Sequence, residues 1–166
     1  MPQDQPLIEN ILDMGFGLTR RTKTSYRLRE GSAPVAGLSL VIRDAELGVA
    51  GTISYWPLAI GAAATPALLL GPLAVHPDRQ NRGLGRILMA ASLKKAREFG
   101  HGLVLLVGDA PYYQQAGFLQ VPAGQLDLPG PFEPNRLMFM ELKSGALAAA
   151  HGLVLAAWRR SPGEPQ

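Results

Sequence analysis

In some segments of the chain the apolar residues recur every three or four positions, which is helical spacing. Other segments are short apolar runs rich in β-branched and aromatic residues. Helical spacing closed by a glycine indicates a helix, and a short apolar run bounded by turn residues indicates a strand. We therefore expect helices at residues 7–15, 20–28 and 84–99, and strands at residues 38–43, 49–58, 68–75, 103–107 and 136–142. Residues 144–158 are ambiguous, because Ala146–Ala150 favours a helical turn and Gly152–Leu155 a strand.

The segment from residue 68 to residue 107 has the order strand, helix, strand. Such a crossover makes the two strands parallel. Residues 103–107 (LVLLV) are apolar throughout, as expected of a strand covered on both faces. The helix between the strands has a wide apolar arc, which fits a helix laid against a sheet. Its apolar residues are Leu84, Ile87, Leu88, Met89, Ala91 and Leu93.

Gly71–Pro72 interrupts the strand expected at residues 68–75. Proline donates no hydrogen bond to a neighbouring strand, so it occurs at a sheet edge or at a bulge. A bulge is favoured here, because so apolar a partner strand as residues 103–107 should be central in the sheet. A bulge at this position would separate the two parallel strands.

Leu68–Gly85 (LLLGPLAVHPDRQNRGLG) leads from the end of a strand through a polar link to the start of a helix. A helix N-terminus carries unpaired N–H groups and a partial positive charge, so it can bind an anion such as phosphate. Gly83 and Gly85 would permit positive φ and close approach of a ligand to the main chain. An ordinary strand-to-helix turn is the alternative.

Two of the known phosphate-binding loops do not fit these residues. A nucleoside-triphosphate loop ends in Gly-Lys-Ser/Thr, whereas Arg86 and Ile87 follow Gly85. A dinucleotide fingerprint needs a third glycine, and Leu88 stands in its place. It also needs a ribose-binding acid about twenty residues on, where only Asp109 is near.

The spacing Gln80-x-x-Gly83-x-Gly85 resembles the acyl-CoA loop of the GNAT N-acetyltransferase superfamily, Gln/Arg-x-x-Gly-x-Gly/Ala. Tyr112–Phe118 resembles the aromatic-Tyr-x-x-x-Gly-Phe segment of the same family. The segments L-G-P-L-A-V (residues 70–75) and G-D-x-x-Y-Y (residues 108–113) are similar to those of one subgroup of acetyltransferases. The resemblance covers about residues 35–142.

This resemblance implies a mixed α/β fold. We expect a central mixed sheet of about six or seven strands, splayed between residues 68–75 and 103–107, with helices on both faces. Residues 1–160 would form a single acyl-CoA N-acyltransferase domain, and residues 161–166 a disordered tail.

The resemblance also implies transfer of an acetyl group from acetyl-CoA, as cosubstrate, to a primary amine of a small molecule or peptide. The chain has no cysteine, which excludes a cysteine acyl-enzyme and favours direct attack by the amine. The alternative is a non-catalytic acyl-CoA-binding module or sensor. Its best support is the lack of a glutamate in residues 68–75, where many family members carry a general base.

Roles for individual residues follow from the resemblance. Tyr113 would protonate the leaving thiolate, and a phenol can do so because it titrates near pH 10 and a thiol near 8.5. Tyr112 would lie at the cofactor or simply anchor a short helix. Residues expected to bind the cofactor are Leu73, Ala74 and Val75 for pantetheine, and Gln80, Asn81, Arg82, Gly83, Leu84, Gly85 and Arg86 for the diphosphate. The general base is open between His76, Asp109, Tyr55, Glu30 and a water chain.

Composition narrows the choice of partners. The net charge is +3, but the basic residues are scattered and not interleaved with aromatics, so we expect solvated surface and no nucleic-acid partner. No apolar run is long enough to span a bilayer, and the N-terminus lacks a signal-peptide pattern, so we expect a cytoplasmic protein. We expect no metal. The apolar segment 145–158 could pack on its own sheet or on a second copy, which leaves a homodimer open.

Overall fold

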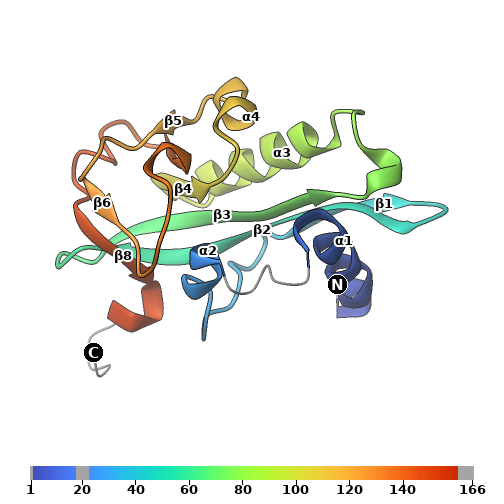
Figure 1. The fold of residues 1–166 in the computed structure, drawn as a ribbon, viewed down its shortest axis with the longest axis horizontal. Helices are drawn as coiled ribbons and strands as arrows, with labels where there is room; N and C mark the ends of the chain where they lie inside the picture. Colours follow the sequence, from blue (N-terminus) through green and yellow to red (C-terminus); the bar gives the residue numbers. More distant parts are fainter. Residues whose placement is uncertain (1, 18–22, 161–166) are drawn as a thin grey trace.

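The computed structural model describes residues 2–17 and 23–160, and within them eight strands form one sheet with helices on both faces (Figure 1). The α-helices are α1 (Gln5–Phe16), α2 (Thr24–Arg27), α3 (Leu84–Glu98) and α4 (Ala110–Gln115). The strands are β1 (Leu40–Asp44), β2 (Gly48–Ile60), β3 (Thr65–Val75), β4 (Leu103–Val107), β5 (Leu119–Gln120), β6 (Leu126–Asp127), β7 (Leu137–Glu141) and β8 (Gly152–Ala156). Short 3-10 helices are η1 (Pro2–Asp4), η3 (Pro77–Arg79), η4 (Pro134–Arg136) and η5 (Ala157–Arg160).

The sheet is mixed. Its strand order is β5-β7-β4-β3-β2-β8-β6, and β1 pairs with β2 beside this path. Strands β3 and β4 are parallel, as the crossover through α3 requires, whereas β2 is antiparallel to β1, β3 and β8. Helices α3 and α4 cover one face, and α1 and α2 lie on the other (Figure 1). The predicted fold class is confirmed.

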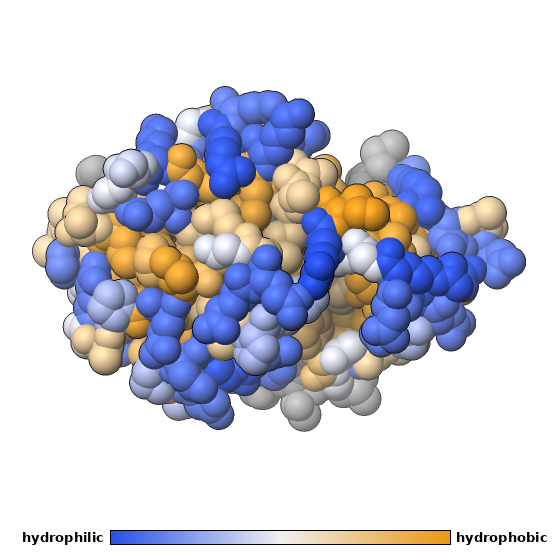
Figure 2. Space-filling view, turned by 90° about the horizontal axis from the view of Figure 1, so that it is seen from above, coloured by the Kyte–Doolittle hydropathy of each residue, from blue (hydrophilic) through white to orange (hydrophobic). Residues whose placement is uncertain are grey.

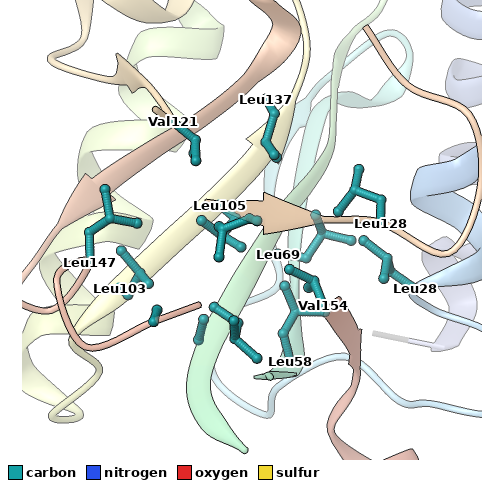
Figure 3. Packing of buried hydrophobic residues seen from close by; sticks show 14 residues of the cluster. Leu28, Leu58, Leu69, Leu103, Leu105, Val121, Leu128, Leu137, Leu147 and Val154 are labelled. Carbon is teal, nitrogen blue, oxygen red and sulfur yellow. The ribbon is translucent and has the colours of Figure 1, made fainter. Parts of the chain in front are cut away.

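Strand β4 separates two hydrophobic cores. Leu103 and Leu105 belong to a cluster on the α2 face of the sheet, which Figure 3 shows, while Val104 and Leu106 belong to the cluster under α3. Each of these four side chains is at most 1% exposed. Both faces of β4 are therefore buried, which is why residues 103–107 are apolar throughout.

The predicted bulge lies in β3. Ile53 of β2 pairs with Leu73 and Tyr55 pairs with Leu70, so the single residue Ser54 faces the dipeptide Gly71–Pro72. Gly71 has a φ of 132°, a conformation that favours glycine. The bulge prediction is confirmed.

The carbonyl oxygen of Gly71 is held by side chains of β2. Ser54 Oγ donates to it at 3.2 Å and Trp56 Nε1 donates at 2.9 Å. These two bonds replace ladder bonds lost at the bulge and fix the indole of Trp56 against β3.

Helix α3 buries a narrower arc than the sequence pattern predicts. Leu88, Met89 and Leu93 are buried as expected, but Ile87 is 58% exposed and Ala91 is exposed as well. Seen from above, over α3 and α4, hydrophobic side chains form patches between hydrophilic ones (Figure 2). Gly85 and Ser92 complete the buried face together with Ala96, so small and polar residues occupy part of the helix–sheet contact.

The ambiguous C-terminal segment, residues 144–158, contains the strand β8. Residues 144–149 form turns, and β8 pairs with β2 and β6, so the apolar tail packs on its own sheet. Strands β5 and β6 have two residues each, too short for a sequence pattern to reveal. Part of the helix expected at residues 20–28, and the whole tail 161–166, lie outside the described residues.

Candidate active site

The site begins where β3 and β4 separate. The two strands pair only through Leu68 with Val104 and Leu69 with Leu105, and β3 then continues to Val75. The N–H of His76 donates to Ala50 O of β2 at 2.7 Å. Because backbone groups alternate along a strand, those of Val75 and Leu73 point the other way, into the gap.

The glycine loop, residues 80–86, follows β3 at the end of this gap. Gly83 is the N-cap of α3 with a φ of 76°, and Asn81 has a φ of 64°. Gln80 Nε2 donates to Val75 O at 3.3 Å, which ties the loop to the end of β3. A cavity of about 530 Å³ lies over the loop, and its lining includes all of the predicted loop residues except Arg82.

Gly85 is required for a reason other than the positive φ expected from sequence. It lies in the first turn of α3, and only Gly83 of the two has a positive φ. A Cβ atom at Gly85 would stand 2.5 Å from Tyr112 Oη. The absence of a side chain at Gly85 therefore lets the ring of Tyr112 approach the helix N-terminus.

The arginines near the loop differ in their environment. Arg79 Nε donates to Asp44 Oδ2 at 2.7 Å, and Arg79 Nη2 donates to Glu46 Oε2 at 3.0 Å. Arg79 thus joins the loop to the turn between β1 and β2. Arg86 donates to Gln115 Oε1 at the end of α4, and Arg82 is exposed.

We expect Asp44→Asn to lower the melting temperature at neutral pH. The Arg79 guanidinium, helped by the backbone N–H groups of Leu47 and Glu46, lowers the pKa of Asp44 from 3.8 to about 2. The pKa of Asp44 is lower in the folded protein than in the unfolded chain, so the ionised carboxylate stabilises the fold at pH values above the unfolded-state pKa. This stabilisation is lost as the pH falls from about 4 towards 2. The difference in melting temperature between the variant and the wild type should therefore become smaller as the pH falls through that range, which thermal melts measure. An exposed Glu98→Gln variant serves as the control, and a constant difference for Asp44→Asn would contradict this account.

A larger cavity of about 890 Å³ continues from the loop along the splayed strands. Val75, Gly85 and Tyr112 line both cavities, so the two adjoin one another. The predicted residues Leu73, Ala74, Val75, Gly85, Tyr112 and Tyr113 all line the larger one. The structure therefore brings the two sequence blocks, residues 80–86 and 112–118, to one groove.

Tyr113 is partly buried in the wall of the groove. Its ring packs edge-on against Tyr112 with 5.0 Å between centroids and against Phe118 at 5.9 Å. A Cβ at Gly108 would stand 2.6 Å from the Tyr113 ring. Burial, with smaller contributions from Tyr112, Tyr55 and Asp109, raises the pKa of Tyr113 well above its usual value. Its hydroxyl therefore stays protonated at neutral pH.

Comparison with known proteins identifies this arrangement. The sequence model of the acetyltransferase (GNAT) family matches residues 7–118. The chain belongs to this family. The family predicted from the residues, and the acetyltransferase class of enzyme, are thus confirmed.

The GNAT relatives match along nearly the whole chain. The uncharacterized N-acetyltransferase YhbS of Escherichia coli (strain K12) is 29% identical over 154 residues, which are 93% of this chain and 91% of that protein. A crystal structure of YhbS from E. coli in complex with CoA has a TM-score of 0.79 at 28% identity and covers 96% of this chain and 89% of its own. A GNAT acetyltransferase from Brucella melitensis in complex with acetyl-CoA has a TM-score of 0.60 at 27% identity, covering 83% and 90%.

Of the four side chains considered as the GNAT general base, one lines the cavity. Asp109 does so, at the N-cap of α4. Tyr55 is fully buried under α3, where its hydroxyl is 2.7 Å from Ser92 Oγ, and burial raises its pKa to about 12. His76 accepts a hydrogen bond from the N–H of Asp78 through Nδ1 and does not line the cavity, and neither does Glu30.

One wall of the GNAT cavity could not be found from the sequence. Thr24 Oγ1 donates to Pro131 O at 2.5 Å, and Arg27 Nη1 donates to Pro129 O at 3.0 Å. These bonds join α2 to a segment more than 100 residues later in the chain, which carries Glu133 into the cavity lining. Residues 122–135 are rich in proline and glycine, which is typical of a connecting segment, but this composition does not reveal what the segment contacts.

Residues 2–17 and 23–160 contain no helix with the length and apolar character needed to cross a bilayer. Nor do they hold a group of three or more His, Asp and Glu side chains placed for a metal ion.

Proposed function

We propose that this GNAT acetyltransferase binds acetyl-CoA along the splayed edge of β3 and transfers the acetyl group directly to a primary amine. Residues 1–160 would act as one acyltransferase domain. The observation that carries the proposal is that Gly85 of the glycine loop, the end of β3 and Tyr113 line one cavity, which adjoins the cavity over the loop. The relatives crystallised with CoA and acetyl-CoA have the same fold and supply the ligand class.

The loop residues account for binding of the diphosphate. Residues 80–86 lead into the first turn of α3, where unpaired N–H groups and backbone dipoles would favour an anion. Arg82 and Arg86 would add charge-assisted hydrogen bonds. Backbone groups of Leu73 and Val75 would pair with the amides of pantetheine, because no strand among the described residues pairs with that edge of β3 beyond Leu69.

The chemistry needs the neutral amine, so the acceptor ammonium first loses one proton to water, and two further proton transfers accompany acetyl transfer. The amine nitrogen forms a bond to the thioester carbonyl carbon, and the C–S bond then breaks. We propose that Tyr113 gives its proton to the departing sulfur, while a carboxylate at the cavity, Asp109 or Glu133, takes the proton from the amine directly or through water. A backbone N–H near Val75 would stabilise the oxyanion.

Binding by the glycine loop can be tested with Gly83→Val. Gly83 has a φ of 76° and open space around its Cβ position. Valine disfavours this conformation, so the loop should rearrange and the Kd for CoA should rise about tenfold or more, given a cost of roughly 1–2 kcal/mol for a left-handed L-residue. Isothermal titration calorimetry measures this directly.

Gly100→Val is the matched control for this test. Gly100 also has a positive φ, 87°, with nothing within 4 Å of its Cβ position, but it follows the other end of α3. It should carry a similar folding cost and leave CoA affinity unchanged. Equal affinity in both variants would remove the loop from the binding site.

A non-catalytic acyl-CoA-binding module is the second candidate, and the lack of a glutamate in β3 favours it. Thiol release from acetyl-CoA with a mixed panel of amines separates the two. Calorimetric binding without thiol release for any amine would favour the module. A small-molecule or peptide acceptor, a homodimer and a cytoplasmic location remain predictions.

A further inference from the structure

The large cavity is lined by charged side chains that acetyl-CoA does not explain. Among the described residues that line it are three cations, Lys23, Arg29 and Arg136, and two anions, Asp109 and Glu133. The thioester and the pantetheine arm of acetyl-CoA are uncharged, and the proposed phosphate site is at residues 80–86. These charged side chains therefore line the cavity that is left for the acceptor.

The presence of both signs of charge restricts the kind of acceptor. A primary amine is protonated near neutral pH, since alkylammonium groups titrate near pH 10. A simple ammonium would be complementary to the anions among the described lining residues, but not to the cations. An acceptor that also carries an anionic group would satisfy both signs of charge.

Of the three cations, Arg29 has a guanidinium whose position against aromatic rings suits it to bind such an anion. Its guanidinium carbon lies 3.9 Å from the centroid of the Tyr26 ring and 5.8 Å from that of Trp56. A guanidinium stacked on an aromatic ring keeps its N–H donors in the plane at its edge, where a carboxylate can bind with two parallel hydrogen bonds.

The neighbours of Arg29 fix its position. Leu28 is 1% exposed in the core, and Glu30 O accepts a hydrogen bond from Trp158 Nε1 at 2.9 Å. Trp56 is itself bonded to Gly71 O at the β3 bulge. Arg29 is therefore tied on both sides of the chain and through Trp56 to the strand that would hold the cofactor.

We propose that the acceptor is an amino acid whose carboxylate binds Arg29 and whose amino group lies toward Asp109 and Tyr113. This inference rests on the proposed function. Tyr26 and Phe132 line the same cavity as Arg29, so an acceptor with an apolar or aromatic side chain fits best. The carboxylate would add binding energy and would place the amine at the thioester.

Three related amines test the proposal: phenylalanine, phenylalaninamide and phenethylamine. They share the benzyl group and the amine, and only phenylalanine has a carboxylate. Wild-type protein should show a kcat/KM for phenylalanine about tenfold or more above the other two, as expected for a charge-assisted pair. Thiol release gives the rates, and calorimetry of the same three compounds in the presence of CoA gives binding without turnover.

Arg29→Gln should remove this preference and leave the Kd for CoA unchanged. Arg29→Lys keeps the charge and should retain part of the preference. Arg159→Gln is the matched control, because the Arg159 guanidinium also lies over an aromatic ring, that of Trp158 at 4.5 Å, and does not line the cavity. Far-UV circular dichroism checks that each variant is folded, and Arg29→Lys provides the test if Arg29→Gln is not.

The outcomes separate the two proposals. Equal binding and turnover of the three amines by wild type would overturn the amino-acid acceptor, and so would a preference that survives in the folded Arg29→Gln variant. If phenylalanine binds more tightly than the other two but no amine causes thiol release, the carboxylate site stands and the acetyltransferase function fails.

Discussion

Tyr113→Phe should lower kcat by about 10²- to 10⁴-fold, the usual contribution of a positioned general acid. The hydroxyl is the only group removed, and the ring contacts with Tyr112 and Phe118 remain. Burial keeps the Tyr113 hydroxyl protonated, so the wild-type enzyme has the acid form available at neutral pH. Single-turnover thiol release measures the chemical step, and calorimetry should give a Kd for CoA close to that of wild type.

Tyr55→Phe is the control for that experiment. Tyr55 is also a buried tyrosine, but its hydroxyl bonds to Ser92 under α3 and does not line the cavity. This variant should lose some stability and keep the single-turnover rate. An undiminished rate in Tyr113→Phe would show that another group, or water, protonates the thiolate.

Leu105→Ala should destabilise the protein by about 2–5 kcal/mol, the range for buried leucines cut back to alanine. Leu105 is 1% exposed and belongs to the cluster shown in Figure 3. It also pairs with Leu69 in the last β3–β4 register pair before the strands separate. The change should therefore loosen the point from which the cofactor groove opens. Urea unfolding followed by circular dichroism gives the free energy.

Leu119→Ala is the matched control for the core prediction. Leu119 is a strand leucine that is 61% exposed, so its truncation should change the unfolding free energy by less than about 0.5 kcal/mol. If the two variants lost the same amount of unfolding free energy, burial of Leu105 would not contribute to stability as the structure indicates.

The order of the longer elements up to β4, and strand β7, was predictable because local patterns carry it, whereas the two-residue strands β5 and β6 were not. The apolar run at residues 103–107 indicated a strand buried on both faces, and Gly71–Pro72 indicated the bulge. The loop Gln80-x-x-Gly83-x-Gly85 and Tyr113 could be singled out for the same reason, since each lies within a short motif. Their functional roles remain predictions.

Contacts between distant segments were not predictable. Glu133 reaches the cavity only because Thr24 and Arg27 bond to the backbone of residues 129–131. Tyr55 was a reasonable candidate for a base from its sequence position, but the pleat of β2 turns it under α3.

By itself the sequence determined the strand–helix–strand unit, the glycine loop and the family, because periodicity, glycine spacing and short motifs depend on neighbouring residues. Only the tertiary structure decided which charges share the groove, and that the Arg29 guanidinium lies near the rings of both Tyr26 and Trp56. The physical reason is that side-chain contacts across more than 100 residues depend on how the sheet curves and which loops cover it, and no local pattern encodes that.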